Sequence, residues 1–318
     1  MNKVLITPKS YHHYKDTAYA LLRKSGYEPV ENQTGRTLTE EEIVTFAREG
    51  VAGIIVGVDP LPGRVLEQLK DVRAISKYGM GVDNIDIERA EALGMQVRAA
   101  KGTNNVSVAE LAIGMLFAAS RHIPAMNAEV KTGGWGRVLG RELTGKKLGL
   151  IGCGQIGFEV AKRARGLEME VVVYDPFLGD DAFAGRPGIY LERSLDTLLA
   201  ESDYISLHVP ATKETHHLIN ERTLAAMKPT AFLINTSRGE LVDEDALYDA
   251  LTSGRLAGAA SDVYSSEPPL PGSKLAQLDT FILTPHTGAF THEAIEKMVL
   301  RSTENLLDML NSNSATAN

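Results

Sequence analysis

The sequence predicts an α/β protein that contains two mostly parallel sheets. Short aliphatic or β-branched runs alternate with longer helical patterns from the first residues onward, which is typical of βαβ units. A long apolar segment separates this series from a second series of the same kind. With 318 residues, and at roughly 100 to 200 residues per domain, the chain is long enough for two domains.

The first hundred residues contain four expected strands and three expected helices. The strands are expected near 3–6, 53–56, 73–76 and 95–98, and the helices near 14–24, 39–47 and 87–93. Thr39 followed by Glu42 is a capping-box pattern, which predicts a helix start at Thr39.

The apolar segment and the second series complete the pattern. Residues 105–130 predict one long helix between the two halves, because no confident terminator appears before Gly133. Strands are then expected near 147–151, 170–174, 204–207, 231–235, 257–261 and 281–283. A last helix is expected from about 292 to 310, with residues 311–318 frayed.

Composition narrows the class of protein. With 33 Lys and Arg against 41 Asp and Glu, the net charge of −8 repels nucleic acids and anionic lipids. The single cysteine, Cys153, excludes an intrachain disulfide, and no secretory signal or membrane span is apparent. The sequence therefore predicts a cytoplasmic protein that binds neither nucleic acid nor membrane.

A glycine-rich loop predicts a dinucleotide site. The strand near 147–151 leads into Gly152-Cys153-Gly154-Gln155-Ile156-Gly157, and a helical pattern follows. Side chains at Gly152 or Gly154 would collide with a pyrophosphate, and the helix N-terminus offers free N–H groups to it. Gly157 allows close packing of helix and strand.

The next strand ends in a carboxylate, as such a site requires. Asp175 lies about 20 residues after the glycines, where it would accept hydrogen bonds from the adenosine ribose. Pro176 rather than arginine follows it, so a 2′-phosphate would meet a negative charge. NAD is therefore expected rather than NADP. Cys153 is interpreted as a small apolar residue of the loop, because no neighbouring cation would activate it.

Three later strands are each followed by one chemically useful residue. Arg238 suits a substrate carboxylate, because its planar fork binds carboxylates through two hydrogen bonds. His286 suits proton transfer near neutral pH, and Glu267 would stabilise its charged form and hold one tautomer. Taken singly, each also fits an ordinary loop position. A Ser/His/Asp hydrolase is the rival use of His286, but the chain has no G-x-S-x-G elbow.

No metal site is expected. The adjacent pairs His12-His13 and His216-His217 lack metal-ligand spacing, and they are interpreted as surface residues whose rings point apart.

With these motifs the sequence resembles the D-isomer-specific 2-hydroxyacid dehydrogenase family, most closely its phosphoglycerate dehydrogenase-like branch. Besides the glycine loop, the resemblance is carried by segments that together span nearly the whole chain: 77–86, 108–111, 235–239, 242–244, 262–269 and 284–289.

The resemblance implies the residues of the site. Arg238, Glu267 and His286 would be the catalytic residues. The implied cofactor site combines the glycine loop and its acid with the loops after the other strands: Gly152, Gly154, Gln155, Ile156, Gly157, Asp175, His208, Val209, Pro210, Thr236, Ser237, Arg238, Asp262, His286 and Gly288. The expected substrate contacts are Lys77, Gly79, Met80, Gly81, Arg238 and His286.

The resemblance also implies the organisation of the molecule. A flavodoxin-like substrate domain would comprise residues 1–99 and 288–318, and a Rossmann NAD-binding domain would comprise residues 100–287, with a hinge that closes the cleft between them. The long helix and the loop around Trp135 are similar to a dimer-forming arm, which predicts a homodimer.

The activity implied is NAD-dependent interconversion of a D-2-hydroxy acid and its 2-keto acid, as in phosphoglycerate dehydrogenases or hydroxypyruvate and glyoxylate reductases. Phosphoglycerate enzymes usually carry an arginine where this chain has Gly57-Val58-Asp59, and Asp59 would repel a phosphate. Lys77 is the alternative source of a cation. Met80 replaces a small polar residue between two glycines, which would narrow the pocket.

Two alternatives remain open. An NAD-sensing interaction protein, like the corepressors that resemble C-terminal binding protein, retains the same fold and the same three residues. Phosphite-type dehydrogenases also keep all three, whereas formate enzymes replace the acid with glutamine.

Overall fold

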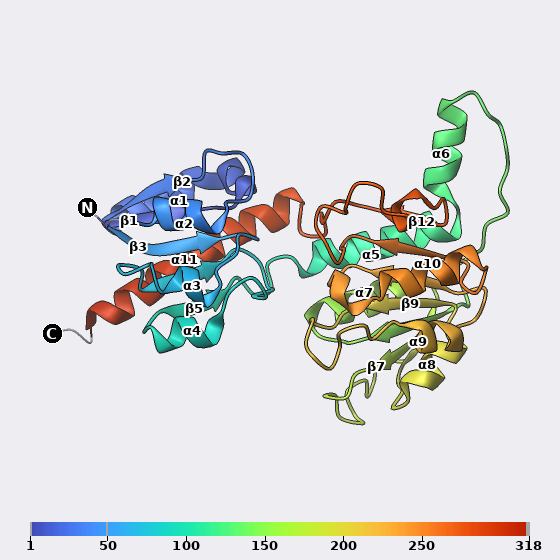
Figure 1. The fold of residues 1–318 in the computed structure, drawn as a ribbon. Coiled ribbons are helices and arrows are strands. Elements are labelled where there is room, and N and C mark those ends of the chain that lie inside the picture. The colour runs from blue at the N-terminus through green and yellow to red at the C-terminus, as the bar shows by residue number, and fades with distance from the viewer. Residues whose placement is uncertain (1, 49, 316–318) are drawn as a thin grey trace. The chain divides into compact units, whose positions relative to one another are not determined.

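The computed structural model describes residues 2–48 and 50–315 (Figure 1). The chain forms two compact units, and each is described by itself. Unit 1 comprises Met1–Asn104 and Ala289–Asn318, and unit 2 comprises Asn105–Gly288.

Unit 1 is built on a five-stranded parallel sheet with the order β2-β1-β3-β4-β5. This order is that of flavodoxin-like doubly wound folds. The strands are β1 (Asn2–Ile6), β2 (Tyr27–Glu31), β3 (Val51–Val56), β4 (Ala74–Lys77) and β5 (Gln96–Ala99). The helices are η1 (Lys9–Tyr14), α1 (Lys15–Lys24), α2 (Glu40–Phe46), α3 (Gly63–Leu66), α4 (Ile87–Ala92) and α11 (His292–Ala315).

Two hydrophobic clusters hold unit 1 together. All six residues of β3 are buried, because helices cover both faces of a parallel sheet. Helix α11 packs on one face through apolar residues at helical spacing, and the fully buried Leu306 lies directly against Gly53 of β3. The predicted capping box is confirmed, since Thr39 and Glu42 exchange side-chain to backbone hydrogen bonds at the start of α2.

Unit 2 is built on a seven-stranded parallel sheet with the order β12-β11-β10-β9-β6-β7-β8. The strands are β6 (Lys147–Ile151), β7 (Glu170–Tyr174), β8 (Ile189–Leu191), β9 (Tyr204–Leu207), β10 (Phe232–Asn235), β11 (Gly258–Ser261) and β12 (Phe281–Leu283). The helices are α5 (Asn105–Ser120), α6 (Ile123–Lys131), α7 (Gln155–Gly166), α8 (Leu195–Glu201), α9 (Glu221–Ala226), η2 (Gly239–Leu241), α10 (Glu244–Thr252) and η3 (Leu275–Gln277).

The strand order of unit 2 reverses beside β6. From β6 the chain goes outward through β7 to β8, and β9 then returns to the other side of β6. This is the Rossmann arrangement, in which a ligand binds at the carboxyl ends of the strands where the order reverses. The predicted fold class, with two parallel-sheet α/β domains, is confirmed.

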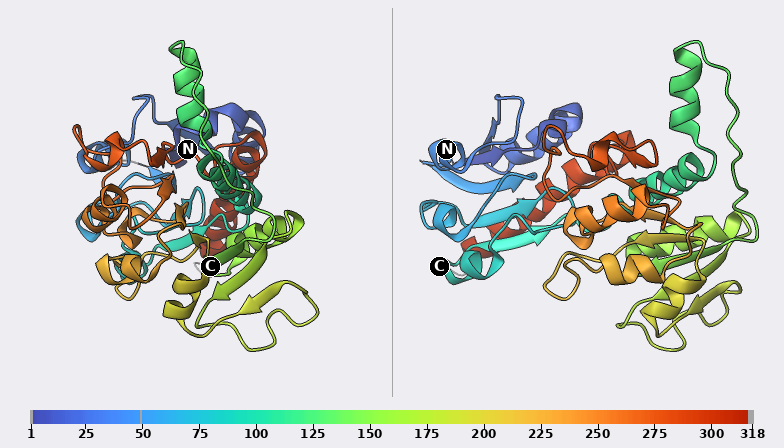
Figure 2. Two further views of the ribbon diagram at one scale, coloured as in Figure 1. Left: turned by 90° about the vertical axis from the view of Figure 1, so that its right-hand side faces the viewer. Right: turned by 45° about the vertical axis from the view of Figure 1, so that its right-hand side comes forward.

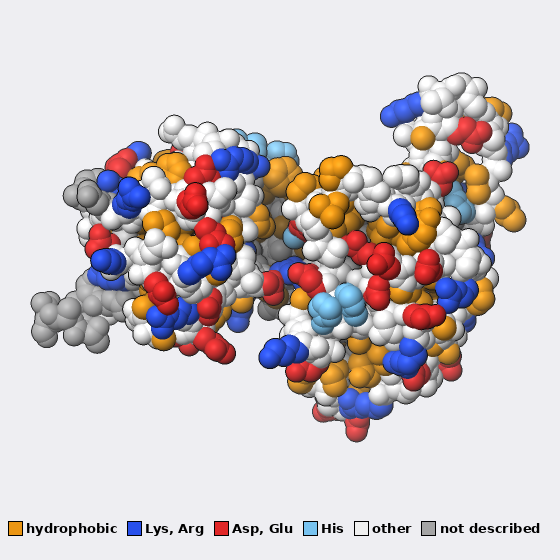
Figure 3. Space-filling view, in the orientation of Figure 1, with side chains coloured by type: hydrophobic (Ala, Val, Ile, Leu, Met, Phe, Trp, Pro, Cys, Tyr) orange, Lys and Arg blue, Asp and Glu red, His pale blue; other side chains and the backbone are white. Residues whose placement is uncertain are grey.

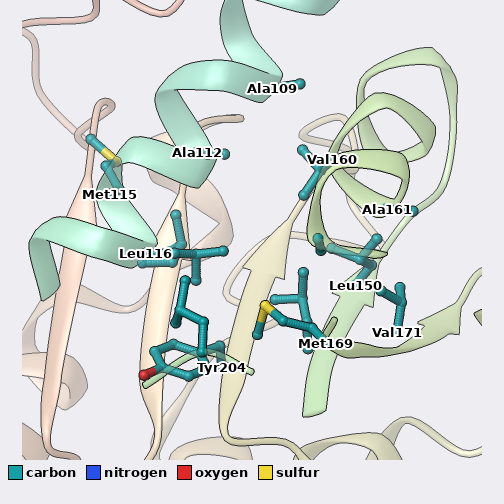
Figure 4. Packing of buried hydrophobic residues seen from close by; sticks show 14 of the residues in the cluster. Ala109, Ala112, Met115, Leu116, Leu150, Val160, Ala161, Met169, Val171 and Tyr204 are labelled. Atoms are coloured by element: carbon teal, nitrogen blue, oxygen red, sulfur yellow. The ribbon is translucent and has the colours of Figure 1, made fainter. Parts of the chain in front are cut away.

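Small side chains let the helices of unit 2 approach the sheet closely. On α5, Ala109 and Ala112 face Val160 and Ala161 of α7, and Leu116 lies over the sheet (Figure 4). Every one of these side chains is buried, so α5 is a core helix of the unit.

The predicted long helix over 105–130 is wrong in one respect, because it consists of two helices. Helix α5 ends at Ser120 and α6 begins at Ile123, with a bend of 64° between them. His122 adopts a left-handed conformation (φ 52°) at the break. Helix α6 and the segment that returns from it therefore project from the sheet of unit 2 (Figures 1 and 2).

Other differences from the expected elements are smaller. The expected strands and helices lie within a few residues of observed ones, but η1, β2, α3, β8, α8, α9, η2, α10 and η3 were not expected. The tail expected to fray is wrong for 311–315, which continue α11, and residues 316–318 lie outside the described range. The paired histidine rings do not point apart, since their centroids lie 4.1 Å (His12, His13) and 4.0 Å (His216, His217) from each other.

Among the described residues, no single helix is long and apolar enough to cross a membrane, although the bent pair α5 and α6 meets that test when taken together.

Candidate active site

The glycine loop joins β6 to α7, and its three glycines have different surroundings. A Cβ on Gly152 would lie 2.6 Å from the carbonyl oxygen of His208, and one on Gly157 would lie 2.5 Å from that of Gly152. Both positions therefore require glycine for packing. A Cβ on Gly154 would meet no protein atom within 4 Å. The open space lies at the N-terminus of α7, whose first turn contains Gln155 and Ile156 and carries a partial positive charge.

Asp175 follows β7 and stabilises this loop through hydrogen bonds. Its two carboxylate oxygens accept hydrogen bonds from the backbone N–H groups of Cys153 and Phe177, both at 3.0 Å. A carboxylate has about four acceptor positions, so capacity remains for the hydroxyl groups of a ribose. Burial, with the nearby charge of Asp175, raises the pKa of the Cys153 thiol to about 12. The thiol is therefore protonated at neutral pH, as its interpretation as an apolar residue requires.

His208, Val209 and Pro210 follow β9, on the other side of the point where the strand order reverses. The His208 ring places Nε2 2.9 Å from Ser206 Oγ, and burial lowers the pKa of His208 to about 4. The ring is therefore neutral at pH 7. In the described part of the chain, two buried polar atoms at these strand ends have no hydrogen-bond partner: His208 Nδ1 and Thr236 Oγ1.

These features fit a dinucleotide. Orphaned buried polar atoms need a partner from outside the protein, and the space above Gly154 admits one close to the backbone. The glycine loop and Asp175 would hold the pyrophosphate and the ribose, as in other Rossmann folds.

Arg238 lies in a turn that the side chain of Asn235 organises. Asn235 Oδ1 accepts a hydrogen bond from the Ser237 N–H (3.0 Å), and its Nδ2 donates to the Arg238 carbonyl (2.8 Å). Ser237 Oγ donates to the carbonyl of Leu207, which ties the turn to β9. Sequence analysis missed this role of Asn235, although asparagine at a strand end typically initiates such turns.

Glu267 and His286 form a hydrogen-bonded pair. His286 Nδ1 lies 2.6 Å from Glu267 Oε2, and both side chains are partly exposed. Burial acts to raise the pKa of Glu267, but the hydrogen bond and charge of His286, helped by Arg238, hold it below its usual value. Glu267 is therefore a carboxylate at neutral pH and accepts from the Nδ1–H of His286. The ring atom left for other partners is Nε2.

Asp262 organises the loop that contains His286. Its buried carboxylate accepts hydrogen bonds from the Thr284 hydroxyl, the Thr287 N–H (2.8 Å) and the Gly288 N–H (2.7 Å). The His286 N–H donates to the carbonyls of Asp262 and Thr284. These contacts support His286 in a left-handed conformation (φ 52°), which is uncommon for residues other than glycine.

The expected site residues of unit 2 thus follow β6, β7, β9, β10, β11 and β12. Because all strands are parallel, the loops after them share one edge of the sheet. The charge of Arg238 acts on Glu267, and Glu267 contacts His286. These loops are brought together, as convergence on one site requires.

Four expected substrate residues, Lys77, Gly79, Met80 and Gly81, lie at and after the end of β4 in unit 1. Lys77 is buried, and its ammonium donates to the carbonyl of Gly57 and to Asn84 Oδ1 (2.6 Å). Gly79 has a φ of 120°, which favours glycine.

Phosphate repulsion by Asp59 stays a prediction, but the structure gives this residue a role inside unit 1. The Asp59 side chain is only 2% exposed, and its carboxylate accepts hydrogen bonds from the Thr7 hydroxyl and the Leu38 N–H. It holds the loops of unit 1 together, whereas the neighbouring Val58 is 64% exposed.

Comparison with known proteins identifies a family. The family model described as D-isomer specific 2-hydroxyacid dehydrogenase, NAD binding domain, matches residues 113–288. The chain is 42% identical over 296 residues to D-3-phosphoglycerate dehydrogenase of Archaeoglobus fulgidus, covering 92% of this chain and 55% of that protein. It thus spans about half the length of that relative.

Two further similarities extend over almost the full length of both partners. Hydroxypyruvate reductase of Thermotoga maritima is 37% identical over 300 residues, which is 93% of this chain and 95% of that one. The crystal structure of the TT0316 protein from Thermus thermophilus superimposes with a TM-score of 0.87 at 36% identity, over 98% and 97% of the two chains.

Proposed function

Because this chain belongs to the D-isomer-specific 2-hydroxyacid dehydrogenase family, we propose that it interconverts a D-2-hydroxy acid and its 2-keto acid with NAD as cofactor. The observation that carries the proposal is the 2.6 Å pair of His286 and Glu267, which lies at the same sheet edge as the glycine loop. Such a pair is suited to donating and accepting one proton near neutral pH.

In the proposed reduction, Arg238 binds the carboxylate of the keto acid through its planar guanidinium group. NADH, when bound by the glycine loop and Asp175, supplies the hydride that adds to the carbonyl carbon. His286 donates its Nε2 proton to the carbonyl oxygen, and Glu267 stabilises the imidazolium beforehand. In the oxidation direction His286 takes the proton back from the hydroxyl.

We assign the cofactor role to unit 2 and the substrate role to unit 1. Support for the first comes from the match of the NAD-binding family model within unit 2. The contacts of Gly79, Met80 and Gly81 with substrate stay predictions. A cytoplasmic location is also proposed, and the presence of one buried cysteine favours it.

An unphosphorylated substrate is favoured over a phosphorylated one. The ammonium of Lys77 already has two oxygen partners, and the exposed residue beside Asp59 is the apolar Val58. A phosphate would need a cation that these positions do not supply.

The test is NADH absorbance with purified protein and a panel of 2-keto acids: glyoxylate, hydroxypyruvate, pyruvate and phosphohydroxypyruvate. We expect turnover of unphosphorylated acids, with NADPH a poorer cofactor. Turnover that is fastest with phosphohydroxypyruvate would overturn the substrate assignment. No turnover of any acid by a protein that still binds NADH would refute the enzymatic role and favour the sensing role.

His286→Ala tests the assignment of the proton donor. We expect turnover to fall at least about 100-fold while NADH affinity stays the same, because a positioned acid contributes roughly that much. An equal loss of turnover and of NADH affinity would contradict the assignment of His286 as the proton donor.

We also propose a homodimer that forms through the arm, defined as residues 121–142. The arm concentrates exposed apolar side chains, of which Trp135 and Leu139 are 79% and 95% exposed, and such a concentration marks interaction surfaces. The others on the arm are Ile123, Val130 and Val138. Hydrophobic side chains are visible on the arm in Figure 3. Leu139→Glu should reduce the mass measured by light scattering from two chains to one. Leu270→Glu, an equally drastic change at another exposed leucine, should leave the mass unchanged.

A further inference from the structure

Tyr264 lies in the loop that carries Glu267 and contacts the segments that carry the other two proposed catalytic residues, and the sequence analysis assigned it no role. It follows β11 by three residues, and its ring packs against the hydrophobic cluster beneath α10. Its contacts involve the His286 loop, the Glu267 loop and the Arg238 turn, and each is made by a different part of the residue.

The hydroxyl group reaches the His286 loop. Tyr264 Oη lies 2.8 Å from the carbonyl oxygen of Thr284 and 3.0 Å from that of Ser261. The Thr284 carbonyl also accepts the backbone N–H of His286, at 3.1 Å. The hydroxyl and the His286 N–H thus share one acceptor, immediately beside the left-handed conformation of His286.

The backbone of Tyr264 reaches the other two segments. Its N–H donates to Glu267 Oε1 (3.1 Å), the oxygen that does not contact His286. Its peptide with Ser265 lies on Gly239, so closely that a Cβ there would lie 1.9 Å from the Tyr264 carbonyl carbon. Gly239 directly follows Arg238.

Burial raises the pKa of Tyr264 to about 12, and the nearby carboxylates of Asp262, Glu267 and Glu244 act in the same direction. The hydroxyl therefore remains a donor throughout the pH range in which an imidazole changes its charge. A phenylalanine would fill the same space without that donor.

We propose that Tyr264 is a positioning residue, whose hydroxyl fixes the His286 loop against the Glu267 loop and so sets the geometry of the proton-donating pair. This inference rests on the proposed function. The Tyr264 side chain needs no contact with substrate for this role, since it acts through the carbonyl of Thr284.

The experiment compares Tyr264→Phe with Tyr248→Phe. Tyr248 lies on α10 and packs against the same cluster. Tyr248→Phe is therefore a matched control, because it removes the same hydroxyl group from similar surroundings. We expect Tyr264→Phe to lower kcat for keto-acid reduction about tenfold, because small misplacements of a reacting group have large effects on rate. The pH profile of kcat should differ from that of Tyr248→Phe, because the geometry of the pair formed by Glu267 and His286 has changed. The NADH dissociation constant and thermal midpoint should stay close to those of Tyr248→Phe.

Two outcomes would overturn the proposal. One is a Tyr264→Phe enzyme whose kcat and pH profile equal those of Tyr248→Phe. The other is a parallel loss of kcat, NADH affinity and thermal midpoint, which would indicate a purely structural role.

A readout without turnover separates this inference from the proposed function. The imidazole signals of His286 in nitrogen-detected NMR spectra can be assigned by their absence in His286→Gln. We expect the Nδ1–H signal, which the hydrogen bond to Glu267 protects, to broaden or shift in Tyr264→Phe and to stay unchanged in Tyr248→Phe. If the signal responds in this way while no keto acid is reduced, the positioning role stands and the proposed reaction falls. If the signal is unchanged in Tyr264→Phe while the enzyme reduces keto acids, the proposed reaction stands and the positioning role falls.

Discussion

At the scale of single residues, the charge of Glu267 is what distinguishes it from a neutral side chain of the same shape. Its carboxylate contacts His286 Nδ1 at 2.6 Å. Burial acts to raise its pKa, but His286, the Tyr264 N–H and Arg238 together hold the pKa below its usual value. The pair therefore stays ionised wherever His286 is protonated.

Glu267→Gln should lower kcat for reduction about 100-fold at pH 7, because the amide no longer stabilises the imidazolium. The loss should persist in mild acid, because His286 holds the pKa of the Glu267 carboxyl below its usual value and the wild type therefore keeps its carboxylate there. A pH series of kcat checks this, with NADH affinity as the control. A loss that disappears at a pH where an ordinary glutamate is still ionised would contradict the electrostatic explanation.

His208 should make the protein less stable in mild acid. Its pKa is about 4 in the folded protein because of burial, against about 6.5 in an unfolded chain, so the unfolded state binds more protons between these values. Stability contributed by the neutral ring is thus present above pH 6.5 and is lost as the pH falls toward 4. At pH 5 this effect lowers the free energy of unfolding by at most about 2 kcal/mol.

Urea unfolding of the wild type and His208→Asn at pH 7 and pH 5 measures this contribution. The variant should lose less stability between the two pH values. The exposed His216 provides the control, because His216→Asn should show the same pH dependence as the wild type.

At the scale of elements, the glycines at the junction of β6 and α7 have different roles. Gly152 and Gly157 are required for packing, and Gly154 leaves space for the proposed cofactor. Gly154→Ala places a methyl group where no protein atom lies within 4 Å, so it should leave stability nearly unchanged and weaken NADH binding at least about tenfold. Gly166→Ala makes the same change at the other end of α7, also in open space. It should leave NADH binding unchanged and stabilise the protein by up to about 1 kcal/mol. Calorimetric titration with NADH decides between them, and similar affinities for both variants would argue against a pyrophosphate at Gly154.

The elements that the sequence predicted share a physical property. The central residues of β6 and β7 are mostly Leu and Val and are buried, so composition identifies these strands. By contrast, β2 contains Pro29 between two glutamates, and β8 has three residues at the edge of its sheet. The break between α5 and α6 could have been predicted, because Pro124 lies in the first turn of α6, a position that proline favours and where it interrupts a preceding helix.

The site divides along similar lines. Arg238, Glu267 and His286 could be proposed from sequence because they follow strand ends with suitable chemistry. The surroundings of Lys77, Asp59 and Tyr264 could not, because each has a partner that meets it only after folding. These partners are Asn84, Thr7 and Thr284, at separations of 7, 52 and 20 residues. The hydrogen bonds that occupy a side chain decide whether it can bind a ligand, and a single sequence does not contain them.

At the scale of the whole molecule, the two units have separate hydrophobic cores. Leu306 of α11 and Leu150 of β6 are both fully buried, one in each unit. Leu306→Ala should destabilise unit 1 by about 2 to 5 kcal/mol, and Leu150→Ala should destabilise unit 2 by a similar amount. Hydrogen exchange read by mass spectrometry should speed up in residues 2–104 and 289–315 for the first variant. For Leu150→Ala, exchange should speed up in residues 105–288. Faster exchange throughout the chain in both variants would mean that the two units unfold together.

The position of α11 in unit 1 also fixes an order of events on the ribosome. Unit 2 is continuous from Asn105 to Gly288, whereas the sheet of unit 1 is synthesised first and its covering helix α11 only after all of unit 2. Domains usually fold as units in the order in which they emerge. Here the second unit to be started is the first to be complete. The part of the earlier sheet that α11 covers, over β3 and β4, stays exposed until translation has passed residue 310, whereas α1 already covers the same face beside β2. A nascent chain paused before α11 should therefore bind nucleotide while its first unit still recruits chaperones.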